Sequence, residues 1–158
     1  PRDQIVPFWQ SITPRTYMGW GKSTQLGYGL GLIMGAKLAE PEKLCINIMG
    51  DAAIGMVGMD LETAVRNKIG ILTIVFNNGI MAIERDTMPY ANEKYGTLSE
   101  GGDYSKVGEG LGVWTRTIKT PEEFVTTLNE AKKIVASGQP VLLDCLVKEG
   151  YKFSHRRE

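Results

Sequence analysis

Four short apolar runs are spaced along the chain, at residues 45–49, 71–76, 113–118 and 141–147. Runs of this length, rich in β-branched residues and flanked by turn residues, are typical of buried strands. The first two runs bracket a segment that is compatible with a helix, which predicts a βαβ unit with parallel strands. The pattern of apolar and polar positions therefore predicts an α/β fold.

Residues 25–40 form a predicted helix that is rich in small residues, with glycines at positions 27, 29, 31 and 35. Glycine lowers helix propensity, so these glycines predict close packing of the helix against a sheet or a ligand. Their spacing is close to a dinucleotide-binding fingerprint, but that fingerprint follows a strand directly, and residues 20–24 do not read as a strand. A dinucleotide-binding fold is the weaker interpretation.

Two further helices are indicated by periodicity and end signals. A helix over residues 58–68 places Leu61 and Ala64 on one apolar face, and a short helix is expected over residues 103–111. Thr120 is a strong helix start, because Pro121 follows it and a glutamate occupies the third helical position. The apolar stripe of that last helix ends at Gly138.

Residues 79–103 lack periodicity, and a stretch of this length inside a compact domain is typical of functional or mobile segments. Its first part, residues 80–84, is expected to continue as a short helix. Glu84 is the acid in this part that could face a substrate. The alternative for Glu84 is a solvated surface position.

Polar residues follow the first two apolar runs directly: Asp51 after the first run and Asn78 after the second. The carboxyl ends of parallel strands meet at one edge of the sheet, where open α/β sheets bind ligands. We therefore expect these side chains to lie close together. A carboxylate, an amide oxygen and the backbone carbonyl just past Asn78 suit a hard cation such as Mg²⁺, which keeps positions for phosphate oxygens and water.

Small residues surround Asp51, namely Gly50, Ala52 and Ala53. They allow backbone N–H groups to approach an anion, and the helix that follows would add its positive end. The residues therefore indicate a magnesium–diphosphate site. The alternative is an ordinary βαβ unit with an aspartate at one turn and an Asn-Gly at the next, because both residues are common in turns.

The same segment resembles the thiamine diphosphate motif, a Gly-Asp-Gly followed some two dozen residues later by Asn-Asn. Here it reads Gly50-Asp51-Ala52 and then Asn77-Asn78, with 27 positions from Asp51 to Asn78. The spacing and the surrounding sequence are similar to the acetolactate synthase and pyruvate decarboxylase group. One departure is Ala52 in place of the motif's third glycine, which a negative φ would accommodate.

The resemblance implies a three-layer, doubly wound parallel sheet and a single diphosphate-binding domain over residues 1–158. It implies thiamine diphosphate and Mg²⁺ as cofactors, and decarboxylation or carboligation of a 2-oxo acid as the activity. Asp51, Asn78 and the carbonyl of Ile80 would hold the metal ion.

The resemblance also assigns roles outside the metal ligands. Leu26 would be the large apolar side chain that bends the coenzyme between its two rings, and main-chain groups of Thr24 and Leu26 would meet the aminopyrimidine. Without the resemblance, Leu26 is simply a core residue. Some decarboxylases of the group carry a catalytic glutamate at the position of Glu84, whereas the synthases do not.

The resemblance implies a partner as well. In this group, a glutamate that acts on the coenzyme comes from a separate pyrimidine-binding domain, usually across a dimer interface. We therefore expect this chain to be catalytically incomplete alone, and to need that domain on a longer chain or another subunit of a homo-oligomer. The chain begins with Pro1, and we expect it to be a processed or partial piece of something longer.

Composition narrows the class of partner. The 18 basic and 18 acidic residues balance, so no net field recruits nucleic acid or an anionic membrane. No apolar run approaches the length of a membrane span. The two cysteines, Cys45 and Cys145, are expected to be buried free thiols in a reducing cytosol, and the single histidine, His155, to be peripheral.

Two alternatives belong to other functional classes. One is a phosphoryl-receiving or otherwise non-catalytic α/β module that uses Asp51 to bind magnesium. Such modules place several acids at strand ends, and the sequence indicates only Asp51 there. The other is a remnant that has lost turnover, for which Ala52 is the hint. Asp51 and Asn78 argue against a remnant, because neither polar residue is expected to be required for packing.

Overall fold

The computed structural model describes residues 5–19, 25–82 and 84–149 of the chain. The strands are β1 (Ile46–Gly50), β2 (Leu72–Asn77), β3 (Trp114–Ile118) and β4 (Val141–Leu146). The helices are α2 (Tyr28–Ala39), α3 (Asp51–Val57), the 3₁₀ turn η1 (Gly58–Asp60), α4 (Leu61–Arg66), α5 (Glu84–Thr87), α6 (Pro89–Tyr95), α7 (Tyr104–Gly110) and α8 (Pro121–Ala136).

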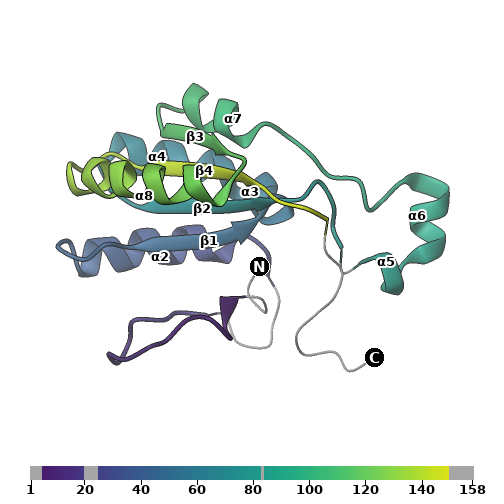
Figure 1. Ribbon diagram of the computed structural model, residues 1–158, viewed down its shortest axis with the longest axis horizontal. Coiled ribbons are helices and arrows are strands. Elements are labelled where there is room, and N and C mark those ends of the chain that lie inside the picture. Colours follow the sequence, from purple (N-terminus) through teal and green to yellow (C-terminus); the bar gives the residue numbers. More distant parts are fainter. Residues whose placement is uncertain (1–4, 20–24, 83, 150–158) are drawn as a thin grey trace.

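The four strands form one sheet in the order β1-β2-β4-β3, and all three pairings are parallel. The last strand in the sequence, β4, therefore lies in the interior of the sheet between β2 and β3 (Figure 1). Gly50 pairs with Phe76, and Asn77 pairs with Leu146. This register brings the carboxyl ends of β1, β2 and β4 to the same edge.

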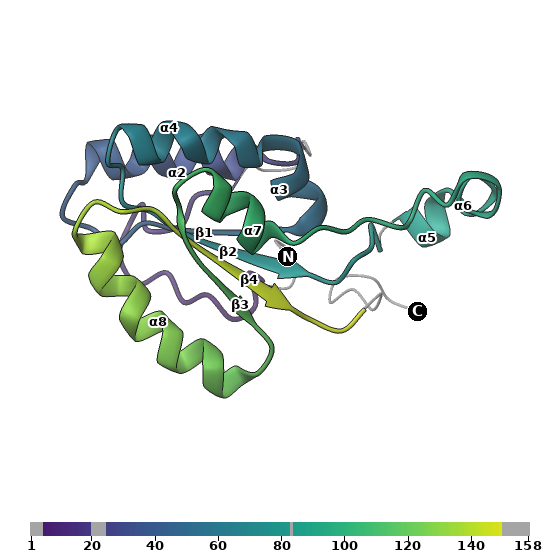
Figure 2. The same ribbon diagram turned by 90° about the horizontal axis from the view of Figure 1, so that it is seen from above.

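Helices cover both faces of the sheet, as the α/β prediction requires. Figure 2 shows α2, α3, α4 and α7 on one face and α8 on the other. The first face packs a cluster that includes Leu30, Ile54 and Leu61, and the second packs a cluster around Leu143 and Ala131. The predicted three-layer arrangement of the parallel sheet is confirmed.

All four predicted strands are present, and their ends lie within one residue of the predicted ones. The prediction of a helix over residues 58–68 is confirmed by η1 and α4, which cover residues 58–66, but it missed the preceding helix α3. A helix begins directly at Asp51, because the small residues after β1 allow the chain to turn at once, and the 3₁₀ turn at Gly58–Asp60 separates it from α4. Leu61 and Ala64 are buried as predicted.

Two of the four glycines before and within α2 have the packing reason that the sequence predicted. Gly27 has a φ of +85°, and a Cβ there would lie 2.5 Å from a methyl group of Val57. A Cβ at Gly29 would lie 2.8 Å from the Asn47 side-chain oxygen, so α2 approaches β1 closely at that point. The prediction does not extend to the glycines at positions 31 and 35, which have open space around them.

The last helix, α8, begins as predicted. The Thr120 hydroxyl accepts the N–H of Glu123 at 3.2 Å, while the Glu123 carboxylate accepts the N–H of Thr120 at 3.3 Å. This reciprocal capping box satisfies two N–H groups that a helix start otherwise leaves without partners. Gly138, with a φ of +90°, follows the end of the helix.

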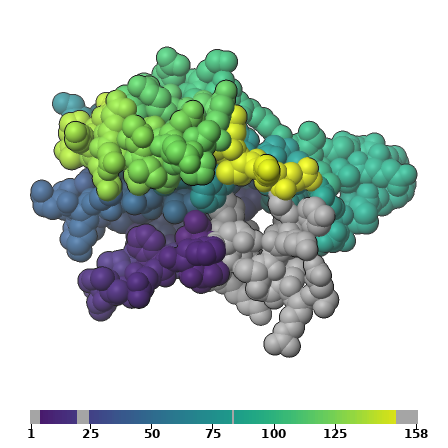
Figure 3. Space-filling view, viewed as in Figure 1, coloured from purple at the N-terminus to yellow at the C-terminus, as the bar shows by residue number. Residues whose placement is uncertain are grey.

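Residues 79–103 form an arm that carries the short helices α5 and α6 (Figures 1 and 3). The prediction of a helix over residues 80–84 is wrong, because α5 starts only at Glu84. Ile80 instead forms an antiparallel bridge with Ser99 on the returning strand of the arm. Arg85 of α5 forms an ion pair with Glu149, which follows β4.

The two cysteines are buried and free, as predicted. Burial raises the pKa of the Cys145 thiol to about 11, so this thiol stays protonated at neutral pH. None of the helices in the described part of the chain combines the length and apolar character that crossing a bilayer requires. His155 lies outside the described residues.

Candidate functional site

Asp51 lies where β1 ends and α3 begins, and its side chain is only 4% exposed. Its Oδ2 accepts two backbone hydrogen bonds from the loop after β2, from Asn78 N at 3.0 Å and from Gly79 N at 2.7 Å. The carboxylate thus joins the ends of two adjacent strands. The expectation that Asp51 is not required for packing is therefore wrong, because it holds this loop in place.

The Asn78 side chain points its terminal amide group at two oxygens. One terminal atom lies 3.0 Å from Asp51 Oδ2 and 3.0 Å from the carbonyl oxygen of Ile80. Placed as nitrogen, this atom donates to both oxygens. Placed as oxygen, it accepts the N–H of Ile80 at 3.3 Å and faces two further oxygens, which a bound cation would hold together.

These separations suit magnesium. Neighbouring ligands of an octahedral Mg²⁺ ion lie about 3.0 Å apart, because each metal–oxygen bond is about 2.1 Å long. The described residues contain no group of three or more His, Cys, Asp or Glu side chains that could hold a metal. A cation here would therefore take one carboxylate, one amide oxygen and one carbonyl, which leaves ligand positions open for phosphate and water.

The small residues beside Asp51 lie where strand and helix meet. Gly50 and Ala53 are buried, and Ala52 is half-buried in the first turn of α3. The N–H of Ala52 donates to Asp51 Oδ1 at 3.0 Å. Because Ala52 has helical backbone angles, its methyl group causes no backbone strain, and the condition set by the sequence analysis is met.

Of the three other predicted site residues, the structure describes Leu26 and Glu84. Leu26 lies in the turn before α2, half-buried and packed against the same core cluster as Leu30. Thr24 lies outside the described residues. Glu84 is the first residue of α5, and its carboxylate accepts a hydrogen bond from the Thr87 hydroxyl at 2.7 Å.

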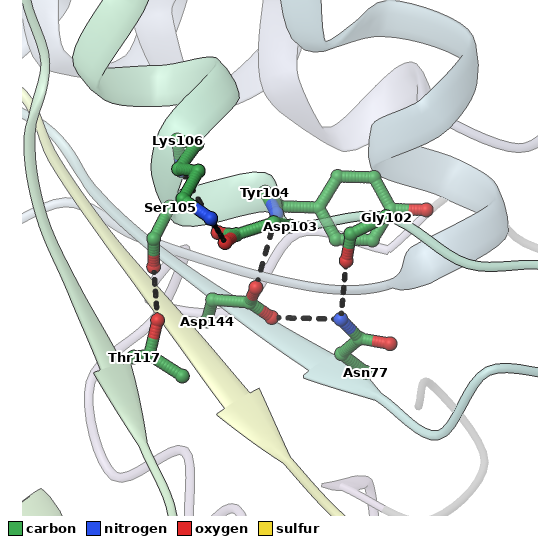
Figure 4. Close-up of polar contacts among 8 residues, drawn as sticks. All are labelled: Asn77, Gly102, Asp103, Tyr104, Ser105, Lys106, Thr117 and Asp144. Carbon is green, nitrogen blue, oxygen red and sulfur yellow. Dashed lines mark hydrogen bonds and ion pairs between the residues drawn. The ribbon is translucent and has the colours of Figure 1, made fainter.

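A second carboxylate near this edge was not predicted from the sequence. Asp144 of β4 is 1% exposed, and its Oδ1 accepts the Asn77 amide at 3.1 Å (Figure 4). Its Oδ2 accepts the N–H of Tyr104 at 3.1 Å. The same Asn77 nitrogen also donates to the Gly102 carbonyl at 3.1 Å. The sequence signal was available, since an acid inside an apolar strand must be paired.

Burial raises the pKa of Asp144 above its ordinary value. The hydrogen bonds from Asn77 and from the N–H groups of Tyr104 and Ser105 act in the opposite direction and offset part of this rise. Asp144 therefore ties β2, β4 and the start of α7 together with matched donors. Both carboxylate oxygens of Asp144 are therefore occupied by donors from the protein.

A third carboxylate, Glu100, lies on the returning strand of the arm. Its backbone N–H donates to the carbonyl of Gly79 at 3.0 Å, and Met81 N donates to the carbonyl of Leu98 at 3.0 Å. Residues 98–100 therefore run alongside residues 79–81. No local pattern in the sequence indicates this pairing, because it depends on how the whole arm folds back.

The comparisons with known proteins bear on this edge. The family described as "Thiamine pyrophosphate enzyme, C-terminal TPP binding domain" matches residues 4–145 of the chain. The chain belongs to this family. The Asp51–Asn78 edge is thus the edge of a thiamine pyrophosphate (TPP) binding domain, which confirms the family predicted from the motif.

Relatives of this TPP-binding domain include several enzymes. A probable acetolactate synthase of Mycobacterium bovis is 30% identical over 148 residues, which cover 92% of this chain and 26% of that protein. A 2-hydroxyacyl-CoA lyase of Oryza sativa is 33% identical over 125 residues, which cover 75% of this chain and 22% of that protein.

A solved structure agrees with these sequence relatives. The thiamine diphosphate-dependent 4-hydroxybenzoylformate decarboxylase of Rhodococcus jostii has a TM-score of 0.68 and 29% identity, covering 80% of this chain and 24% of that chain. The TPP-binding domain described here thus spans about a quarter of the length of the relatives it matches.

Proposed function

We propose that this chain binds thiamine diphosphate through a magnesium ion, and forms the diphosphate-binding half of an enzyme that decarboxylates or ligates a 2-oxo acid. The observation that carries the proposal is the convergence of Asp51 Oδ2, the Asn78 amide and the Ile80 carbonyl at 3.0 Å separations. The membership of the TPP-binding family supports the choice of ligand.

Each residue has a stated task in this proposal. Asp51, Asn78 and Ile80 supply three oxygens to the cation, and the cation neutralises the diphosphate. The backbone N–H groups at Gly50 and Ala53 would approach the phosphate oxygens, while the N–H of Ala52 donates to Asp51 Oδ1 and holds that carboxylate in place. Leu26 and the backbone of Thr24 position the rest of the coenzyme. The bound coenzyme itself supplies stabilisation of the negative charge that develops when a 2-oxo acid loses carbon dioxide.

The names of the relatives support a 2-oxo acid as the proposed substrate class. Two of the relatives are named as an acetolactate synthase and a 4-hydroxybenzoylformate decarboxylase, and both names describe reactions at the carbon beside a carbonyl group. The short share of those proteins that this chain spans supports a partner, a pyrimidine-binding domain on the same polypeptide or another subunit of a homo-oligomer. We propose a cytoplasmic location for the assembly.

Glu84 is proposed as the acid that donates a proton to the reacting substrate. Its carboxylate lies at the start of the arm, four residues beyond Ile80, and it is half-buried. The Glu84→Gln change would then lower the turnover of the complete enzyme and leave magnesium-dependent coenzyme binding unchanged. Equal turnover of both proteins would remove Glu84 from the proposal.

The deciding experiment is isothermal titration calorimetry of thiamine diphosphate, with and without Mg²⁺, on the complete protein with its partner domain. We expect binding that requires Mg²⁺ and is lost in Asp51→Ala and in Asn78→Ala. Circular dichroism establishes that both variants are folded. Asp60→Ala is the matched control, because Asp60 is an exposed aspartate of the same motif segment and should leave binding intact.

The absence of binding by the folded wild-type protein would overturn the proposal. The phosphoryl-receiving alternative expects several acids at the strand ends, and Asp144 is a second acid near this edge. Both oxygens of Asp144 accept hydrogen bonds from the protein, so it supports that alternative poorly.

A further inference from the structure

Glu100 is fixed beside the three oxygens of the proposed cation site. It lies opposite Gly79, between the two ligand residues Asn78 and Ile80, through the hydrogen bond from its N–H to the Gly79 carbonyl at 3.0 Å. The Ile80–Ser99 bridge holds the same register. Gly79 has no side chain and a φ of +73°, so the loop leaves space at the point where Glu100 approaches it.

One carboxylate oxygen of Glu100 has no partner. Within the part of the chain that the structure describes, Glu100 Oε2 is a buried side-chain oxygen that accepts no hydrogen bond. Burial raises the pKa of Glu100, and the negative charge of Asp51 raises it further. A buried acceptor that lies within the electrostatic reach of another carboxylate is costly unless a cation or a donor is bound to it.

The contrast with Asp144 shows that this cost is not general at the sheet edge. Asp144 is more deeply buried than Glu100, yet both of its oxygens accept hydrogen bonds from the protein. Both oxygens of Asp144 therefore have donors from the protein, whereas Oε2 of Glu100 has none. The backbone of Glu100 is hydrogen-bonded to Gly79, the residue between Asn78 and Ile80.

We propose that Glu100 is a fourth protein group of the cation site, and that its Oε2 holds a water molecule bound to the magnesium ion. This inference rests on the proposed function. Magnesium gives up its water reluctantly and usually keeps several water ligands, which suits a carboxylate placed one water molecule away. Such outer partners orient metal ligands and contribute to the affinity for the metal.

The charge count gives the consequence for binding. Asp51 alone supplies one negative charge to a divalent cation, whereas Asp51 and Glu100 together supply two. With both carboxylates the protein neutralises the cation before any diphosphate arrives. The site should therefore bind a divalent cation in the absence of thiamine diphosphate, and Glu100 is the positioning residue that makes this possible.

The test uses Mn²⁺ alone, added to the chain without coenzyme and followed by electron paramagnetic resonance of the free ion. We expect Glu100→Gln to weaken Mn²⁺ binding by about 10- to 100-fold, the usual effect of removing an outer partner. The same change should raise the melting temperature of the metal-free protein, because it removes a buried charge without a partner. A purely structural role would lower both quantities.

Two matched variants sharpen the result. Glu93→Gln removes the same charge from an exposed position of α6 and should leave Mn²⁺ binding unchanged. Glu100→Asp keeps the charge but withdraws the carboxylate by one methylene group. It should lose most of the affinity if Glu100 acts through a positioned water molecule, and retain it if only the charge matters, which would overturn the water contact.

The outcomes separate this inference from the function on which it rests. If Glu100→Gln binds Mn²⁺ as tightly as wild type while Asp51→Ala does not bind it, the role of Glu100 is wrong and the cation site stands. If the wild-type chain binds no Mn²⁺ alone but binds it with thiamine diphosphate, the role of Glu100 is again wrong. If the complete protein with its partner domain binds Mn²⁺ under neither condition, the proposed function itself fails.

Discussion

Asn77 and Asn78 are consecutive in the chain and lie in opposite surroundings. Asn77 is 8% exposed and donates to two acceptors, the Asp144 carboxylate and the Gly102 carbonyl. Asn78 points one atom of its terminal amide at Asp51 Oδ2 and at the Ile80 carbonyl oxygen, each 3.0 Å away. Asn77 joins a carboxylate to a backbone carbonyl as a donor, whereas Asn78 lies between two oxygens that could both bind a cation.

This difference separates a structural polar network from a ligand site. A buried network with matched partners stabilises the fold and needs nothing further. A carboxylate, an amide and a carbonyl that converge at the end of a sheet can in addition bind a hard cation. Asn77 and Asn78 are consecutive residues at the same edge of the sheet. A variant of Asn77 should therefore lower stability and a variant of Asn78 should lower binding.

The largest effect is expected from Asp144→Ala. The change leaves the N–H of Tyr104 without an acceptor and the Asn77 amide with only the Gly102 carbonyl, which should cost about 3 kcal/mol of unfolding free energy. Urea denaturation measures this loss as a lower midpoint. Asp86→Ala is the control, since Asp86 is exposed on α5 and its removal should change stability by less than about 0.5 kcal/mol. Equal midpoints for the two variants would contradict the network.

The next effect is a crossed pattern between the two asparagines. Asn77→Ala removes the donor to a buried carboxylate and should destabilise the protein by about 2 kcal/mol. Asn78→Ala should change stability by less than about 0.5 kcal/mol and abolish binding of Mn²⁺. Urea denaturation and Mn²⁺ titration on both variants check the pattern. If Asn77→Ala weakened binding more than Asn78→Ala, the assignment of the two roles would be reversed.

A smaller effect concerns pH. Because burial raises the pKa of Asp144 in the folded chain, the folded state binds more protons than the unfolded state between the ordinary value of 3.8 and the raised one. Stability relative to the Asp144→Asn variant should therefore fall as the pH rises through that window, by at most about 1.4 kcal/mol per pH unit. Urea denaturation from acid to neutral pH measures the slope. If stability instead rises with pH in this window, the hydrogen bonds to Asp144 outweigh the effect of its burial on its pKa.

The smallest effect is expected from Ala52→Gly, which restores the third residue of the thiamine diphosphate motif. Ala52 has helical backbone angles, so glycine gains nothing in conformation and should cost less than about 1 kcal/mol through lost helix propensity. Thermal unfolding and Mn²⁺ titration should show slightly lower stability and unchanged affinity. A large gain in affinity would instead mark Ala52 as a damaged position.

The strands and the start of α8 were predictable because their signals are local. Thr120 and Glu123 are three residues apart and cap the helix in the manner that their spacing predicts. Asp51 and Asn78 were predictable for a different reason. Parallel strands bring their carboxyl ends together, so topology alone placed these two residues at one edge.

Asp144 and Glu100 were missed for reasons that differ. Asp144 is the one acid in an apolar strand, and its need for a partner was visible, but the partner Asn77 lies 67 residues earlier in the sequence. Glu100 depends on how the arm returns beside Gly79, which no local pattern encodes. The helix α3 was missed because its start at Asp51 is decided by the geometry of the strand end.

The position of β4 in the interior of the sheet has a consequence for how the protein is made. During synthesis β1, β2 and β3 leave the ribosome first, yet β3 pairs with neither β1 nor β2. The sheet is complete only when β4 pairs with both β2 and β3, which also brings Asp144 to Asn77. Pairings over such long separations form slowly, and until then apolar strand faces are exposed to other chains. The time between the emergence of β2 and the arrival of β4 is therefore when this chain most needs a chaperone.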